Sequence, residues 1–390
     1  MAQRSPNPYR PGFNQPPSEL AGREEVLSAA REALDVAVLD GRTPRPLLLV
    51  GTRGVGKTVL LGEIAATAAA LHSWPSAAVE VRPGGRFVDR LAGRLAATTA
   101  LFEQSKPGRR FRVTSATLRA GAVGLGAEVN LSAEPPTAAL SLEAALTATC
   151  AAAEARSSGL VVAVDELQLA DRGELAEFTA TLQEHVVDGW PLVVVAAGLP
   201  SLREPRRSVT YLERGEWHEL GLLDGAATLR ALTAPASSAG RPFEEAAAHL
   251  LVQASGGYPY AIQVLGHHAW RASTGSARIG LADAQRAVAA AEADLAAGLY
   301  AARWSDASAT ERTYLSALAR LVIDGAPHTG ADVAAALDRK PQAVSYLRDR
   351  LLKKGTIFAE GRNLHFVVPG LAQWVLESGG VWENAGPVSH

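Results

Sequence analysis

Short apolar runs alternate with longer amphipathic stretches over the first 220 residues. The apolar runs lie at 47–50, 77–81, 160–164 and 191–200. Strands that are buried on both faces, as in a parallel sheet covered by helices, have this composition. The stretches between the runs predict helices at 24–39, 56–71, 87–102, 141–156 and 173–187. This alternation predicts an α/β fold whose parallel sheet lies between two layers of helices.

The pattern changes after residue 222. Residues 223–304 predict a small helical lid that is interrupted at 234–242 and 255–260. From 305 to 377, helices at 310–321, 330–337 and 341–354 precede a hairpin at 356–368, an order that predicts a winged helix-turn-helix domain. Alternating residues with three glycines at 112–131 predict a β-hairpin inserted into the α/β order. We therefore expect a proline-rich arm (1–18), a core (19–222), the lid, the winged-helix domain and a tail (378–390).

The first apolar run leads directly into a glycine-rich turn with the phosphate-loop pattern G-x-x-x-x-G-K-[ST]. Glycines let the backbone turn several N–H groups toward one anion, and the N-terminus of the following helix adds its positive dipole end. Lys57 is expected to reach the β and γ oxygens of a triphosphate, and Thr58 offers a hydroxyl to Mg²⁺. The expected nucleotide-binding residues of this turn are Gly51, Gly54, Val55, Gly56, Lys57, Thr58 and Val59.

Two acids follow the run at 160–164. Asp165 and Glu166 come at the carboxyl end of a buried strand, which is the edge where α/β sheets bind their ligands. We expect Asp165 to hold Mg²⁺ and its waters, and Glu166 to polarise the water that attacks the γ-phosphate. An acidic helix cap would have the same residues, but the phosphate loop upstream favours the catalytic interpretation.

For two further roles, sensing the γ-phosphate and stabilising transition-state charge, the sequence offers one candidate residue each. Many related ATPases end the strand at 191–200 in a Ser, Thr or Asn that senses the γ-phosphate, whereas this strand ends in Ala197 and Gly198. Gln168 is a substitute candidate. Arg214, just before the last strand, is the candidate that stabilises transition-state charge, within the chain or across a subunit boundary. A surface arginine without a function is the alternative.

Charge and cysteine content limit the classes of function. The formal net charge of −2 gives no global field toward nucleic acid or membrane, so such binding needs a local patch. The single cysteine, Cys150, excludes internal disulfides and thiolate zinc sites and favours the cytosol. No apolar run is long enough to span a bilayer, and residues 1–17 lack the apolar core of a secretory signal. We expect a cytoplasmic protein without a membrane partner.

The third helix of the predicted winged-helix domain has two distinct faces. Val344, Leu347 and Leu351 share the core face, and the other face presents Gln342, Ser345, Tyr346, Asp349, Arg350 and Lys353. Between residues 330 and 374 there are seven basic and four acidic residues. Contact with duplex DNA is one interpretation of this local charge. The alternative is a solvated face used for protein contact, which the central Asp349 supports.

The order of these motifs resembles the STAND and AAA+ branch of P-loop ATPases over about residues 18–377. The segment Gly22-Arg23-Glu24 and the lid sequence Gly256-Gly257-Tyr258-Pro259 narrow the resemblance. The chain is similar to prokaryotic ATP-binding proteins related to archaeal STAND-type ATPases and, more distantly, to origin-recognition initiators. The resemblance implies that Pro259 packs on the adenine and that Gly22 and Arg23 lie at the base and ribose. Initiators usually carry an arginine sensor on a lid helix, where this chain has Tyr258-Pro259-Tyr260, so the STAND type fits better.

STAND proteins act as switches in which ADP holds the lid and the winged helix against the core and ATP releases them. We therefore expect a Mg²⁺-dependent, slow ATPase that works as a switch, with an unidentified protein partner and a nucleotide-dependent homo-oligomer. One alternative is a DNA-binding initiator or transposition-helper ATPase that uses the winged helix on duplex DNA. Another is a nucleotide-bound scaffold without turnover, whose hairpin insertion docks a partner.

Overall fold

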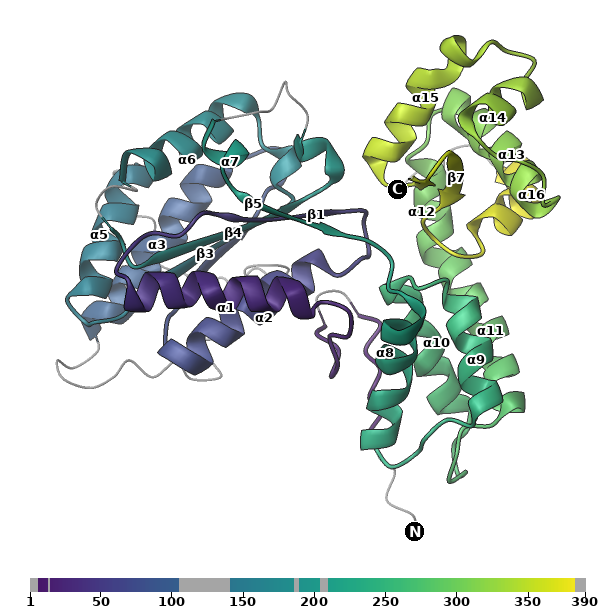
Figure 1. The fold of residues 1–390 in the computed structure, drawn as a ribbon, viewed down its shortest axis with the longest axis horizontal. Helices are drawn as coiled ribbons and strands as arrows, with labels where there is room; N and C mark the ends of the chain where they lie inside the picture. Colours follow the sequence, from purple (N-terminus) through teal and green to yellow (C-terminus); the bar gives the residue numbers. More distant parts are fainter. Residues whose placement is uncertain (1–5, 13–14, 105–140, 186–188, 204–209, 383–390) are drawn as a thin grey trace.

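The computed structural model describes residues 6–12, 15–104, 141–185, 189–203 and 210–382. The predicted hairpin at 112–131 lies outside these residues. Two bodies make up the described chain: an α/β core, and a helical lid that continues into a C-terminal region (Figure 1). Within the described ranges, no helix is both long enough and apolar enough to cross a membrane.

Five parallel strands form the core sheet in the order β2-β3-β4-β1-β5. Their bounds are Leu47–Gly51 (β1), Ser76–Glu80 (β2), Leu160–Asp165 (β3), Leu192–Gly198 (β4) and Glu216–Leu220 (β5). Strands β1, β3 and β4 are buried along their whole length, which confirms the interpretation of the apolar runs. Because all five strands run the same way, the glycine-rich turn after β1 and the acids after β3 meet at one edge of the sheet.

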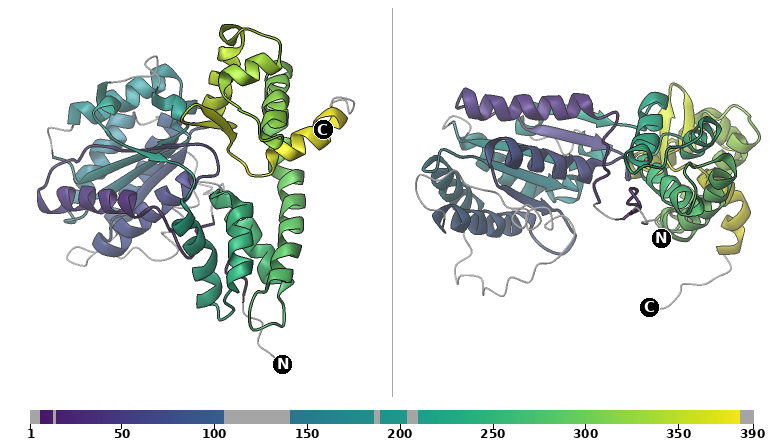
Figure 2. Two further views of the ribbon diagram at one scale, coloured as in Figure 1. Left: turned by 45° about the vertical axis from the view of Figure 1, so that its right-hand side comes forward. Right: turned by 90° about the horizontal axis from the view of Figure 1, so that it is seen from below.

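Helices cover both faces of this sheet, as the alternation predicted (Figure 2). One hydrophobic cluster joins the sheet to α1 (Glu24–Leu39) and α2 (Lys57–His72). A second cluster on the other face joins it to α3 (Phe87–Gln104), α5 (Leu142–Glu154), α6 (Arg172–His185) and the short α7 (Thr210–Glu213). Packing of helices on both faces fixes the position of the sheet, and with it the position of its carboxyl edge.

The lid contains α8 (Gly225–Ser238), α9 (Glu245–Ser255), α10 (Pro259–Ala272) and α11 (Leu281–Leu295). It continues through the π-helix η5 (Ala296–Tyr300) into α12 (Ala301–Ser305). The predicted break at 234–242 is present, but it begins later than expected, because α8 runs through Pro235 to Ser238 and α9 begins at Glu245. A proline in the last turn of a helix removes one hydrogen bond without ending the helix. A break at 273–280 was not predicted.

The C-terminal region begins with α13 (Ala309–Ile323), α14 (Gly330–Ala336) and α15 (Pro341–Lys354). An antiparallel hairpin follows, β6 (Ile357–Glu360) and β7 (Asn363–Phe366), and then α16 (Leu371–Trp382), which was not predicted. Pro341 suits the first position of α15, and Gly355 ends the helix at φ +65°, a conformation that favours glycine. Val344, Leu347 and Leu351 are buried, as predicted.

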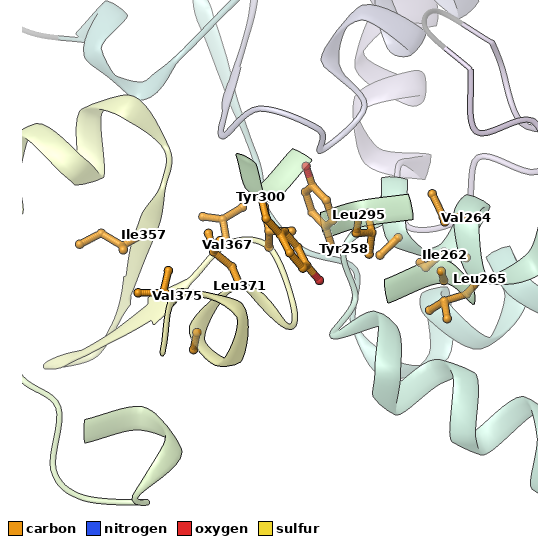
Figure 3. Packing of buried hydrophobic residues seen from close by; sticks show 14 of the residues in the cluster. Tyr258, Ile262, Val264, Leu265, Leu295, Tyr300, Ile357, Val367, Leu371 and Val375 are labelled. Atoms are coloured by element: carbon orange, nitrogen blue, oxygen red, sulfur yellow. The ribbon is translucent and has the colours of Figure 1, made fainter. Parts of the chain in front are cut away.

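The lid and the C-terminal region share one hydrophobic core. A single cluster of buried residues extends from Tyr258 and Leu265 in the lid, through Leu295 and Tyr300, to Val375 in α16 (Figure 3). The lid and the C-terminal region are therefore packed as one body, and this body meets the α/β core near the glycine-rich turn.

The N-terminal arm is fastened to the lid. Tyr9 is 2% exposed and its ring fills the space beside Gly266, where a Cβ would overlap the ring. The Tyr9 hydroxyl donates a hydrogen bond to the carbonyl oxygen of Leu232, and the amide of Asn7 donates to that of His267 at 3.2 Å. Residues 6–12 therefore lie on the lid.

We expect Tyr9→Ala to free the arm from the lid. Removing this buried ring should lower the local stability of the lid by about 3 kcal/mol. Hydrogen–deuterium exchange of α8 and α10 should then be faster than in the wild type. Tyr9→Phe keeps the ring and loses only the hydroxyl bond, a loss of about 1 kcal/mol. Unchanged exchange in Tyr9→Ala would show that the arm is not anchored there.

Candidate functional site

The glycine-rich turn has the backbone geometry that its sequence predicted. Gly54 has φ +85° and Gly56 has φ +96°, both in the left-handed region that favours glycine. A Cβ on Gly54 would overlap the hydroxyl group of Tyr258, whereas the space next to Gly56 is open. A Cβ on Gly51 would overlap the carbonyl of Leu220, so the absence of a side chain at Gly51 lets β1 and β5 pack closely.

Lys57 lies inside the turn and is 5% exposed. Its ammonium donates hydrogen bonds to the carbonyl oxygens of Gly51 (2.9 Å) and Thr52 (2.8 Å). The pKa of Lys57 is lowered to about 8, chiefly by burial; Glu166 and Asp165 oppose this shift, and the cations Arg53 and Arg303 contribute to it. The turn therefore holds a lysine whose charged form would gain from a nearby anion.

Thr58 and Asp165 come together from α2 and β3. The Thr58 hydroxyl donates to Oδ2 of Asp165 at 2.5 Å, and the N–H of Glu166 donates to Oδ1 at 2.8 Å. Asp165 is 3% exposed, and burial raises its pKa. In the described part of the chain it has no ion-pair partner within 4 Å, so a cation beside it would offset the cost of its burial.

The oxygen ligands available beside Thr58 suit Mg²⁺, which takes most of its ligands from phosphate and water. They are too few for a metal site built from protein side chains alone. Among the described residues, no group of three or more His, Cys, Asp or Glu is placed to hold a metal. Mg²⁺ is usually bound through one or two carboxylates together with oxygens of a phosphorylated ligand and water. The hydroxyl of Thr58 and the carboxylate of Asp165 fit this pattern.

Glu166 faces the cavity from a left-handed backbone position, with φ +53°. Its carboxylate accepts a hydrogen bond from the Gln168 side chain at 2.5 Å, and Gln168 in turn accepts one from the N–H of Leu199 at 2.9 Å. Gln168 therefore links the end of β4 to Glu166. Its predicted role as a γ-phosphate sensor stays a prediction, and its position next to the proposed water-polarising acid supports it.

A cavity of about 450 Å³ lies between the core, the lid and the arm. Its volume falls in the range of small-molecule sites. The core side is formed by the turn, Arg23, Arg53 and Glu166. The lid side is mostly apolar and contains Leu223, Ala231, Pro259, Tyr260, Ile262, Gln263 and Leu299. The arm and the two residues after it contribute Arg10, Pro11, Gly12, Gln15, Pro17, Glu19 and Leu20. A charged end and an apolar end are therefore joined in one cavity.

Arg23 and Pro259 lie at this cavity, but Gly22 does not line it. Arg23 is 9% exposed and donates to the carbonyl oxygens of Val55 (3.1 Å) and Gly221 (2.7 Å), so it braces the turn against the exit from β5. Gly22 has φ +72° and packs against Ala227 of the lid. Pro259 begins α10 on the apolar side of the cavity.

Arg214 is not brought to the cavity. It precedes β5, whose first residue, Glu216, pairs with Leu47, the first residue of β1. Arg214 therefore lies at the amino edge of the sheet, and the glycine-rich turn lies at the carboxyl edge. The suggested role within its own chain does not fit this position, because a whole strand length separates Arg214 from the turn. A role across a subunit boundary stays a prediction.

The structure adds residues that sequence reasoning missed. Arg53 occupies a variable position of the phosphate-loop pattern, so only its charge could have drawn attention to it. The arm residues and Leu299 line the cavity through tertiary packing, for which the sequence has no local signal. The hydroxyl of Tyr258 donates a hydrogen bond to the carbonyl oxygen of Arg53 at 3.1 Å. The lid sequence Gly256-Gly257-Tyr258-Pro259 gives no indication of this contact.

Comparisons with known proteins agree with this geometry. Residues 19–195 match the family model of the AAA ATPase domain, and residues 297–375 match that of a domain of unknown function. A comparison with curated proteins finds no match.

Among solved structures, the chain is similar to the Walker-type ATPase of Pyrococcus abyssi, with a TM-score of 0.64 and 17% identity over 93% of this chain and 98% of that one. It is also similar to Cdc6p from Pyrobaculum aerophilum (TM-score 0.50, 14% identity, 95% and 97% covered). The RuvB Holliday junction branch migration motor of Thermotoga maritima has a TM-score of 0.49 and 17% identity, with 91% and 96% covered. At these identities the likeness concerns the fold. The core thus has a P-loop nucleotide triphosphatase-like fold, and residues 19–195 are similar to the AAA ATPase domain.

Proposed function

We propose that this protein binds and slowly hydrolyses ATP with Mg²⁺, and that the bound nucleotide controls the position of the lid and the C-terminal region. The observation that carries the proposal is the cavity lined by Lys57, Thr58 and Glu166, with Asp165 hydrogen-bonded to Thr58. The match of residues 19–195 to the AAA ATPase domain supports it.

The roles proposed for the residues follow from their placement. Lys57 and the N–H groups of the turn hold the β- and γ-phosphates, and Arg23 keeps the turn in shape. Thr58 and Asp165 hold the metal, which when bound neutralises charge that develops on the phosphate oxygens. Glu166, positioned by Gln168, orients the attacking water and accepts its proton. The apolar side with Pro259 takes the base.

The switch is supported by two contacts on the turn itself. From the lid, the hydroxyl of Tyr258 donates to the carbonyl oxygen of Arg53 and lies against Gly54. From the C-terminal region, a Cβ on Gly355 would lie 3.1 Å from the Cβ of Thr52, so that the end of α15 packs on the turn. Phosphate binding that repositions the turn changes both contacts together, as in the STAND-type switch that the sequence resembles.

A second candidate function is contact with duplex DNA, with α13 to β7 as a winged helix-turn-helix. A crevice of about 640 Å³ between α14, α15 and the hairpin contains Arg348 and Arg362, and this observation favours the candidate. Most of these basic side chains are already paired: Arg348 lies 2.8 Å from Asp349, and Lys354 lies 2.9 Å and Arg350 3.3 Å from the buried carboxylate of Glu311. These pairs make the switch the better-supported function.

Nucleotide affinity should fall as the pH rises above about 8. The pKa of Lys57 is about 8 in the free protein, and a bound phosphate raises it, so binding above this pH must take up a proton. We expect a loss of up to about tenfold in ADP affinity per pH unit, measured by calorimetry between about pH 7 and 9.5. Lys57→Arg stays charged throughout and should bind without this pH dependence. A constant wild-type affinity over the range would contradict the role of Lys57.

Substitution of Glu166 should separate binding from turnover. Glu166→Gln should keep Mg²⁺-ATP binding and lose hydrolysis by about 10²- to 10⁴-fold, because the amide cannot accept the proton of water. Lys57→Ala should bind no ATP. Glu213→Gln, an exposed acid on α7, is the matched control for both assays. Wild-type turnover in Glu166→Gln would mean that another group activates the water.

The DNA candidate predicts salt-dependent binding through Arg362. If this arginine contacts a phosphate, Arg362→Gln should make the slope of log affinity against log salt concentration less negative by about 0.9. Arg320→Gln, an exposed arginine on α13 outside the crevice, should leave the slope unchanged. Fluorescence anisotropy with a labelled duplex measures both. Lack of any binding by the wild type at low salt would eliminate the candidate.

A further inference from the structure

The crevice in the C-terminal region has the size and the lining of a small-molecule site. Its volume of about 640 Å³ falls in the range of such sites. Residues of α13, α14, α15 and the β6–β7 hairpin form its walls, and these elements lie together in Figure 1. The N–H of Leu364 in the hairpin donates a hydrogen bond to the carbonyl oxygen of His328 at 3.1 Å. The hairpin wall is therefore held against the segment that precedes α14.

The hydroxyl of Tyr314 is an unpartnered polar group at this crevice. The side chain, on α13, is 1% exposed, and its hydroxyl oxygen makes no hydrogen bond within the described residues. A buried hydroxyl without a partner costs free energy, and most buried polar side chains in proteins are paired. Because Tyr314 lines the crevice, a molecule that fills the crevice can supply the missing partner.

Two arginines bring positive charge to the crevice from different walls. Nε and Nη2 of Arg348, on α15, donate to Oδ1 of Asp349 at 3.0 and 2.8 Å, and Nη1 has no hydrogen-bond partner among the described residues. A Cβ on Gly330 would lie 3.3 Å from this Nη1, which places the nitrogen at the crevice wall. Arg362, at the turn of the hairpin, is exposed and has no ion pair in the part of the chain that the structure describes.

The remaining lining indicates what else the ligand carries. Val344, Leu352 and Leu364 give the crevice an apolar side. The described residues that line it include no acid, so nothing in the lining repels an anion. Guanidinium groups bind carboxylate and phosphate oxygens through charge-assisted hydrogen bonds. The lining therefore suits a negatively charged group attached to an apolar body.

We propose that this crevice binds a small organic anion whose carboxylate or phosphate group contacts Arg348 and Arg362. Its apolar body lies along the apolar side of the crevice, and one of its oxygens accepts a hydrogen bond from the hydroxyl of Tyr314. This site is separate from the nucleotide cavity and does not depend on the proposed function. The wall helix α15 ends at Gly355, which packs against Thr52, so a bound ligand lies on the same helix that contacts the glycine-rich turn.

A duplex would use the same arginines differently. DNA phosphates are contacted at the protein surface, where each basic side chain adds to the salt dependence of binding. The hydroxyl of Tyr314 lies below that surface. Asp349, whose side chain is 50% exposed, also places a negative charge next to Arg348. The crevice therefore fits a small ligand better than a phosphate backbone.

Calorimetry with naphthoate and naphthyl phosphate tests the proposal on the full chain. The two probes distinguish a carboxylate from a phosphate ester, and naphthalenemethanol is the neutral control. At least one anion should bind, and the alcohol should bind at least about tenfold more weakly. Arg348→Gln and Arg362→Gln should each weaken anion binding by about 10- to 100-fold, the range for a lost hydrogen bond to a charged group. Arg320→Gln, which removes an exposed arginine outside the crevice, should have no effect.

Tyr314→Phe distinguishes a ligand contact from a structural role, because it removes only the hydroxyl. Without ligand, the Tm of this variant should equal or exceed that of the wild type, since an unpaired buried hydroxyl has been lost. Its affinity for the anion should fall by about 3- to 10-fold. A lower Tm with unchanged affinity would show that the hydroxyl is structural and would contradict the proposal.

Two further outcomes would overturn it. One is the lack of binding of either anion at millimolar concentration, including the case in which a labelled duplex binds and loses affinity in Arg362→Gln. The other is anion binding that survives both arginine substitutions, which would place the bound anion elsewhere on the protein.

Discussion

The absence of a side chain at Gly54 is the constraint on which the rest of the site depends. It allows the left-handed backbone that opens the turn toward an anion, and it leaves room for the hydroxyl of Tyr258. Through that hydroxyl the lid touches the turn, and the lid shares its hydrophobic core with the C-terminal region. One missing methyl group therefore lets two bodies of the protein meet at the place where phosphate is expected to bind.

Basic and acidic groups both lie on the core side of this meeting point. Arg23, Arg53 and Lys57 line the cavity together with Glu166, and Asp165 accepts a hydrogen bond from Thr58. Burial lowers the pKa of Lys57 and raises that of Asp165, so each group is less stable in its charged form than it would be in water. A phosphate chain beside the cations and a divalent metal beside the acids would relieve both sets at once. The proposed function therefore calls for a metal–polyphosphate complex rather than for either component alone.

The sequence predicted the parts of the site that depend on local pattern. Lys57 and Asp165 could be assigned because a strand, a glycine-rich turn and a helix have strong local signals, and parallel strands bring their carboxyl ends together. Arg214 was misplaced because its distance from the turn depends on the direction of β5, which its neighbours in sequence do not reveal. The contact of Tyr258 with the turn escaped notice for a related reason. It arises from packing between residues far apart in the chain, and the sequence around Tyr258 does not distinguish it from an ordinary core residue.

A crystal structure of the full chain with Mg²⁺ and a non-hydrolysable ATP analogue tests the central claim most directly. We expect the phosphates to lie in the glycine-rich turn beside Lys57, the metal between Thr58 and Asp165, and the base against Pro259. A nucleotide bound elsewhere, or a metal far from Asp165 with the turn unchanged, would contradict it.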